Sequence, residues 1–119
     1  MFAVALWDGP QRRFVLARDG LGIKPLYYSF DGKSLVFSSE VRSLLAGGVS
    51  SELDQAGALD YLAYGKVHAP RTILRDVLKL PAGHTLTVDD SGLKIEAYWR
   101  LPRRRAQATS VAEAVERLD

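Results

Sequence analysis

The sequence contains no cysteine, one methionine and only two histidines, His68 and His84. The absence of cysteine excludes disulfide bonds, thiolate metal sites and a thiol nucleophile within these 119 residues. The two histidines are well separated and stand in loop-like contexts, so no compact cluster of metal ligands is expected.

The chain also lacks a strong charge of either sign and a long apolar run. Sixteen basic against fourteen acidic side chains give a net charge of +2, which does not indicate a nucleic-acid-binding surface. The opening stretch MFAVALWDGP reaches Asp8 before it could act as a signal or cross a bilayer. With 47% hydrophobic and 25% charged residues, the composition is that of one globular domain, and we expect it in the cytoplasm.

Apolar patterning predicts three antiparallel hairpins. Residues 1–7 and 13–18 are apolar on both faces, which is typical of strands covered on both sides. The second hairpin joins residues 25–30 to 34–39 across an Asp-Gly turn, and the third joins residues 85–88 to 93–99.

Two helices are predicted between the second and third hairpins. The first begins after Ser38 or Ser39 as N-cap and ends at residues 47–48, which are both glycine. The second is capped by Asp54 and stopped by Gly65. Its apolar residues form one stripe, made of Ala58, Leu59, Leu62 and Ala63.

The last twenty residues differ from the rest. Arg100 and residues 103–105 make a small basic cluster around Pro102, which favours a solvated linker over an RNA-binding segment. Ser110 and Glu113 then have the spacing of a capping box and predict the start of an amphipathic helix. We expect another domain to follow this helix.

Asp19 stands between two apolar strands, in the stretch LARDGLGIKPLYY. A nucleotide-binding loop is disfavoured here, because Gly20 and Gly22 lack a third glycine and a strand follows instead of a helix. Asp19 could be a turn residue that accepts hydrogen bonds from its own backbone. It could also hold the ammonium group of a small ligand by a charge-assisted hydrogen bond. The pattern leaves both interpretations open.

Five stretches carry a family resemblance, in an order and spacing that span nearly the whole chain. The chain resembles the glutamine-hydrolysing asparagine synthetases through MFAVALWD, LARDGLGIKPLYY, LVFSSEVRSLLA, LDYLAYGKVHAPRTILRDVLKLPAGHTLTV and YWRLP. The resemblance implies an α+β fold, a partial αββα sandwich of antiparallel sheets of the class II glutamine amidotransferase (N-terminal-nucleophile hydrolase) type. Residues 1–101 would be the C-terminal part of that domain, 102–109 a linker, and 110–119 the start of the first helix of the synthetase domain.

The resemblance also implies an overall reaction for the parent protein. Glutamine, aspartate and ATP give asparagine, glutamate, AMP and diphosphate, with ATP and Mg²⁺ bound in the synthetase domain and no cofactor in this chain. The implied partners are glutamine, the remainder of the amidotransferase domain, the synthetase domain and a second copy in a homodimer, but neither nucleic acid nor membrane.

Within the site, the resemblance assigns Asp19 to the α-amino group of glutamine. The residues expected to shape its loop are Arg18, Gly22, Lys24 and Pro25. The family's nucleophile is a cysteine at the mature N-terminus, so no catalytic residue is assigned and the chain alone is expected to be inactive. The sequence departs from the family at Gly20, where a larger residue is usual, and at Lys66 and His68.

Two other functions remain open. The chain could be a non-catalytic protein that binds a partner by strand addition, including a separately encoded N-terminal half. It could also belong to a related synthetase with a different acceptor. If the chain is part of an amidotransferase domain, as the resemblance implies, we expect an open sheet edge and exposed apolar faces, and with them association or aggregation of the isolated chain.

Overall fold

The computed structural model describes residues 1–102, so nearly all of the expected linker (102–109) and the whole expected helix start (110–119) lie outside the described residues. The elements in chain order are β1 (Ala3–Asp8), β2 (Arg13–Arg18), β3 (Tyr27–Phe30), β4 (Leu35–Ser38), α1 (Val41–Ala46), α2 (Gln55–Tyr64), β5 (Leu78–Lys79), β6 (His84–Asp89) and β7 (Gly92–Ala97).

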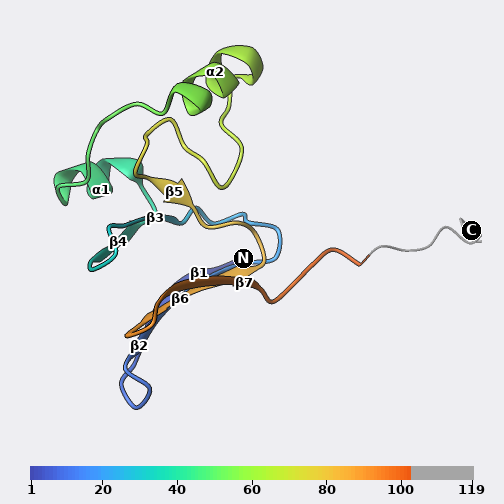
Figure 1. The fold of residues 1–119 in the computed structure, drawn as a ribbon. Coiled ribbons are helices and arrows are strands. Elements are labelled where there is room, and N and C mark those ends of the chain that lie inside the picture. The colour runs from blue at the N-terminus through green and yellow to red at the C-terminus, as the bar shows by residue number, and fades with distance from the viewer. Residues whose placement is uncertain (103–119) are drawn as a thin grey trace, which may run out of the picture.

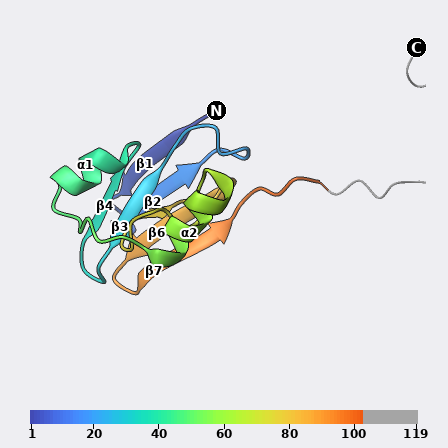
Figure 2. The same cartoon turned by 90° about the horizontal axis from the view of Figure 1, so that it is seen from above.

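The strands form two antiparallel sheets, which confirms the α+β class. One sheet has the order β1-β2-β6-β7 and the other the order β4-β3-β5. The smaller sheet lies between the four-stranded sheet and the two helices (Figure 1), and a view from above shows the strands of the two sheets overlapping (Figure 2). The described part thus contains the two stacked antiparallel sheets of the expected sandwich, with helices on one side.

The three predicted hairpins are confirmed by their registers. The first pairs residues from Ala3↔Arg18 to Asp8↔Arg13. The second closes at Phe30↔Leu35 and the third at Asp89↔Gly92. The central pairing of β2 with β6 joins strands that are far apart in sequence and sets Leu16 opposite Leu86, both fully buried.

Two hydrophobic clusters hold the layers together. The larger one comprises Leu16, Leu26, Tyr28, Leu80 and Leu86, which come from both sheets and the segments beside them. The second lies at α1 and comprises Leu44, Leu74 and Val77. The Asp19 loop is attached to the larger cluster, since Leu16 precedes it on β2 and Leu26 follows it.

The structure contradicts the prediction that the first strand is covered on both sides, and it confirms the open sheet edge with exposed apolar residues that was also expected. β1 is an edge strand of its sheet, and its side chains are largely exposed: Leu6 is 60% and Trp7 59% accessible. No strand within residues 1–102 pairs with the outer edge of β1. Apolar residues on both faces therefore mark surfaces that nothing in the described part of the chain covers.

The helix caps were predicted in part. Asp54 caps α2 as expected, because its side chain accepts the N–H of Gly57 at 2.8 Å, and Gly65 ends the helix with φ +68°. The N-cap of α1 is Glu40 and not Ser38 or Ser39. The Ser38 hydroxyl accepts the N–H of Glu40 at 3.1 Å, so it closes the turn ahead of the cap.

The apolar stripe of α2 is exposed instead of packed. Leu59 is 67% and Leu62 81% accessible, and Gly57 is the buried residue of the helix. Gly57 lies against the Thr72 backbone, where a side chain would collide with the Thr72 carbonyl oxygen. The helix therefore approaches the fold through its backbone at Gly57 and presents its larger apolar residues outward. None of the described helices is long and apolar enough to cross a membrane.

Candidate functional site: the Asp19 loop

The loop after β2 is folded around the side chain of Asp19. This side chain is buried, with 5% of the residue accessible. Its Oδ1 accepts the backbone N–H groups of Leu21 (3.2 Å) and Ile23 (3.1 Å). Its Oδ2 accepts those of Lys24 (3.1 Å) and Phe2 (3.3 Å). The hydrogen bonds of the turn interpretation are therefore present, and they fix both oxygens.

The same contacts set the charge of the site. Burial by itself raises the pKa of Asp19, but the backbone N–H groups, led by those of Lys24 and Ile23, outweigh it and lower the pKa to about 2. Asp19 is consequently ionised at neutral pH. The loop holds a fixed negative charge at the end of β2.

The backbone of Asp19 is bonded as firmly as its side chain. Its carbonyl oxygen accepts the N–H of Gly22 and that of Gly83, both at 2.9 Å, and its N–H donates to the carbonyl of Phe2 at 3.0 Å. Gly22 has φ +66°, and a Cβ there would lie 2.9 Å from the Cβ of Ala82. Both the backbone conformation and the available space at this position therefore require glycine.

Arg18 holds the loop from the other side. Its buried guanidinium donates to the carbonyl oxygens of Lys24 (2.7 Å), Gly22 (2.6 Å) and Leu80 (2.6 Å). A guanidinium presents five donors in a rigid planar arrangement, so a single arginine side chain can donate to several carbonyl groups at once. Arg18 thus connects the loop to the segment between β5 and β6.

The residues predicted to shape the loop all lie in it. Lys24 contributes through its backbone, since its N–H reaches Asp19 and its carbonyl accepts from Arg18. Pro25 is exposed and leads into the buried Leu26, whose carbonyl accepts the N–H of Leu80 at 3.0 Å. The structure brings these residues together, and their roles in a glutamine site stay a prediction.

Four residues of the site were missed by the sequence reasoning: Phe2, Gly83, Tyr98 and Trp99. The Tyr98 hydroxyl donates to the carbonyl of Arg18 at 2.7 Å. The N–H groups of Tyr98 and Trp99 both donate to the carbonyl of Gly83, at 2.9 and 3.1 Å. The aromatic pair of the motif YWRLP could have indicated this part of the site. It lies about eighty residues from Asp19 in the sequence, so no local pattern predicts the contact.

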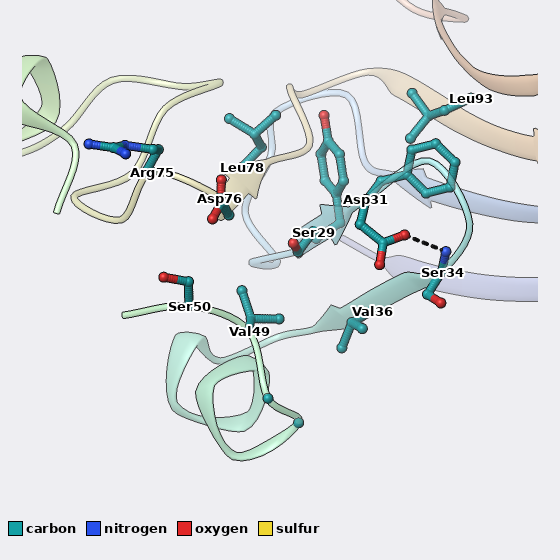
Figure 3. Close-up of a pocket in the computed structure, with 14 residues that line it drawn as sticks. Ser29, Asp31, Ser34, Val36, Val49, Ser50, Arg75, Asp76, Leu78 and Leu93 are labelled. Carbon is teal, nitrogen blue, oxygen red and sulfur yellow. Dashed lines mark hydrogen bonds between the residues drawn. The ribbon is translucent and has the colours of Figure 1, made fainter. Parts of the chain in front are cut away.

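A separate cavity of about 730 Å³ lies between the smaller sheet and the segment after α1. Figure 3 shows Asp31 at this cavity with its hydrogen bond to Ser34, and Arg75 on the opposite side. Asp31 accepts the N–H groups of Lys33 and Ser34 at 2.8 and 2.7 Å, and Arg75 forms an ion pair with Glu52 at 2.8 Å. The residues that line the cavity do not include the Asp19 loop.

Neither histidine ring is hydrogen-bonded to the carboxylate of Asp19. His84 Nδ1 is 2.7 Å from the carbonyl of Ala82, and the ring of His68 packs edge-on against Tyr64. Within residues 1–102, no group of three or more His, Cys, Asp or Glu side chains is placed to hold a metal ion.

Comparison with known proteins gives a consistent result. Residues 1–99 match the family described as glutamine amidotransferase domain. The chain is 33% identical over 103 residues to asparagine synthetase [glutamine-hydrolyzing] 3 of Bacillus subtilis, a match that covers 85% of this chain and 17% of that protein. It is 32% identical over 107 residues to a putative asparagine synthetase [glutamine-hydrolyzing] 2 of Methanocaldococcus jannaschii, covering 86% and 21%.

A relative with another name also matches. The chain is 33% identical over 91 residues to amidase chry2 of Gibberella zeae, covering 71% of this chain and 12% of that protein. The chain spans about a fifth or less of the length of these curated relatives.

Proposed function

The chain belongs to the glutamine amidotransferase domain family, and from this membership we propose that its Asp19 loop binds the α-amino group of glutamine in a glutamine-hydrolysing asparagine synthetase. The observation that carries the proposal is the buried, ionised carboxylate of Asp19, fixed at the end of β2 by backbone N–H groups. The likeness of most of the chain to asparagine synthetases supports the choice of synthetase.

The chemistry follows from the charge and from the contact lengths. An ammonium group and a carboxylate form a charge-assisted hydrogen bond, which is shorter and stronger than a neutral one. A carboxylate can accept about four hydrogen bonds. Four backbone N–H groups already donate to Asp19, so an ammonium group must replace one of them. The N–H of Phe2 makes the longest of these contacts, 3.3 Å to Oδ2, and the ammonium would replace it with the least loss.

This arrangement would select the free amino acid. A glutamine within a peptide has an amide nitrogen in place of the ammonium, so it offers no positive charge to Oδ2. An analogue without the ammonium cannot offer Oδ2 a charge-assisted hydrogen bond in exchange for the N–H of Phe2, so it gains nothing at this contact and binds more weakly. Asp19 accordingly acts in binding and has no part in bond cleavage.

The remaining steps of the proposed reaction are assigned outside this chain. The 119 residues contain no cysteine, so we assign the attack on the glutamine amide to another part of the protein. The described residues offer no set of side chains suited to a metal ion, and ATP and Mg²⁺ are assigned to the synthetase domain. That domain would convert aspartate and ammonia to asparagine.

A second candidate function, strand-addition binding, is favoured by the outer edge of β1. This strand exposes Val4, Leu6 and Trp7, and the described residues leave its outer edge without a paired strand. The remainder of an amidotransferase domain, or a separately encoded subunit, would complete the sheet by adding a strand there. A related synthetase with a different acceptor stays an alternative. Homodimer formation and cytoplasmic localisation stay expectations.

The test of the main proposal is calorimetric titration of L-glutamine into the chain and into Asp19→Asn. We expect the variant to lose glutamine binding at least tenfold, since it lacks the negative charge. Asp89→Asn is the matched control, because Asp89 is also an aspartate whose pKa is lowered by hydrogen bonds within a turn, to Ser91. Equal glutamine affinity in the two variants, with both still folded by circular dichroism, would contradict the proposal.

A further inference from the structure

We propose that Tyr98 and Trp99 are positioning residues, which hold the Asp19 loop in the geometry that binds an ammonium group. The inference rests on the proposed function of Asp19 and extends it to a segment that is distant in sequence. We call the pair Tyr98 and Trp99 the aromatic clamp. Three independent sets of contacts support it.

The first set is made by the Tyr98 side chain. Its hydroxyl donates to the carbonyl of Arg18 at 2.7 Å, directly before Asp19. Its ring is stacked near that of Phe2, with ring centres 6.5 Å apart and planes inclined by 22°. Phe2 supplies one of the N–H groups on the Asp19 carboxylate. The Tyr98 side chain therefore contacts both the residue before Asp19 and the residue whose N–H donates to Oδ2 of Asp19.

The second set runs through the backbone of Gly83. The Gly83 N–H donates to the carbonyl of Asp19, while the Gly83 carbonyl accepts the N–H groups of both clamp residues. Gly83 has φ +67°, and a Cβ at this position would lie 2.6 Å from the Trp99 carbonyl oxygen. Glycine thus permits the close approach through which the clamp is bonded to the Asp19 backbone.

The third set is the packing of the Trp99 ring over Gly20. An ideal Cβ on Gly20 would lie 2.9 Å from two atoms of this ring. Gly20 is not among the glycines with positive φ, so its backbone conformation is open to other residues. The space taken by Trp99 therefore explains why glycine suits this position, at which the sequence departs from the family pattern.

These contacts matter because the donors to Asp19 are backbone groups. The position of the carboxylate therefore depends on the conformation of the loop that carries the N–H groups of Leu21, Ile23 and Lys24. The clamp restrains this loop at Arg18, Asp19 and Gly20. It directly follows β7, at whose end, Ala97, the chain leaves the sheet (Figure 1). Displacing the clamp would loosen the loop and weaken ammonium binding, while the sheet stays intact.

Amide hydrogen exchange on Tyr98→Phe and Trp99→Ala tests the positioning directly. We expect the N–H groups of Leu21, Ile23 and Lys24 to exchange about three- to tenfold faster, the effect of losing one ordinary hydrogen bond. The N–H groups of β2 and β6 should be unchanged. Tyr64→Phe is the control, since Tyr64 is an exposed tyrosine on α2, away from the loop.

Glutamine affinity of the same variants, measured by calorimetry, adds a result that a purely structural role would not produce. We expect affinity to fall by the same factor as the loop exchange rises, while the melting temperature falls only as far as the loss of this one contact requires. Faster exchange with unchanged affinity would overturn the positioning role, and so would unchanged exchange. If the unsubstituted chain does not bind glutamine, the proposed function fails, whereas the exchange rates still decide whether the clamp holds the loop.

A double-mutant cycle at Gly20 and Trp99 tests their packing without relying on a single variant. Gly20→Ala should speed loop exchange in the unsubstituted chain, because the added methyl group meets the Trp99 ring. In the Trp99→Ala background, the same Gly20→Ala change should have little further effect. Strictly additive effects would show that the two residues act independently, and would overturn the third argument for the clamp.

Discussion

The guanidinium of Arg18 donates a 2.6 Å hydrogen bond to the carbonyl oxygen of Leu80, and so joins the end of β2 to the segment that leads into β6. Leu80 is fully buried in the larger hydrophobic cluster. The contact anchors the Asp19 loop to the core of the fold, because the same guanidinium bonds Gly22 and Lys24 within the loop.

Replacing Arg18 by lysine should destabilise the fold by about 2–4 kcal/mol, because one ammonium group cannot reach three carbonyl oxygens and buried acceptors lose their partners. Urea unfolding measures this change. Arg42→Lys, an exposed position on α1, is the control and should change the free energy of unfolding by less than about 0.5 kcal/mol. Similar effects at the two positions would show that the Arg18 contacts do not stabilise the loop.

Asp19 should contribute to stability against acid. Its pKa in the folded chain, about 2, is below the ordinary value of 3.8, so the unfolded state binds the proton more readily. The contribution is complete above pH 3.8 and is lost as the pH falls toward about 2. Asp19→Asn should therefore flatten the dependence of the melting temperature on pH in this interval.

The flattening should be partial, because hydrogen bonds also lower the pKa values of Asp31 and Asp89. Thermal melts at several pH values between 2 and 4 distinguish the contributions when Asp31→Asn is measured alongside. An unaltered pH profile in Asp19→Asn would mean that the carboxylate is not held by the loop.

Alanine substitution at Gly22 and Gly32, which both have positive φ, distinguishes the free-energy cost of backbone conformation from that of a steric collision. Gly22→Ala should destabilise the chain by about 1–3 kcal/mol, because it combines φ +66° with a close contact to Ala82. Gly32→Ala should cost less, since Gly32 has φ +91° but open space around the added methyl group. Chemical denaturation of both variants provides the comparison, and a larger loss at Gly32 would contradict it.

The outer edge of β1 should cause the isolated chain to associate. Exposed apolar side chains next to unpaired backbone groups favour strand pairing between molecules. Leu6→Lys should reduce the associated fraction in sedimentation velocity, whereas Leu62→Lys, on the exposed face of α2, should change it less. A monodisperse chain that melts cooperatively without any substitution would rule out association at this edge.

The sequence predicted those features that are determined by near neighbours. The Asp54 cap and the Gly65 stop each depend on a few adjacent residues, and both are confirmed. The turn at Asp31-Gly32 is confirmed in its place, but it is less tight than predicted, because residues 31–34 lie between the paired Phe30 and Leu35 and only Gly32 of the two has positive φ. The backbone hydrogen bonds of Asp19 within its loop were also foreseen as one of two interpretations. The binding of an ammonium group at Asp19 stays a prediction.

The features that sequence reasoning missed are of two kinds. Some are hydrogen bonds between distant segments, and others depend on whether a neighbouring segment covers an apolar face. The bonds from Arg18 to Leu80 and from Tyr98 to Arg18 span most of the chain, and no local pattern indicates them. The exposure of the apolar stripe of α2 was missed for a different reason, whereas the open edge at β1 was predicted. An apolar pattern predicts that a face can be covered, but it does not say which segment covers it.

The central claim, that the Asp19 loop binds the α-amino group of glutamine, is tested most directly by an NMR titration of the ¹⁵N-labelled chain. L-glutamine and Nα-acetyl-L-glutamine are compared, and the amide signals of Leu21, Ile23 and Lys24 are followed. The proposed role of Asp19 predicts that L-glutamine shifts these signals and that the acetylated analogue, which has no ammonium group, does not. Equal shifts with both ligands, or no shift with either, would contradict it.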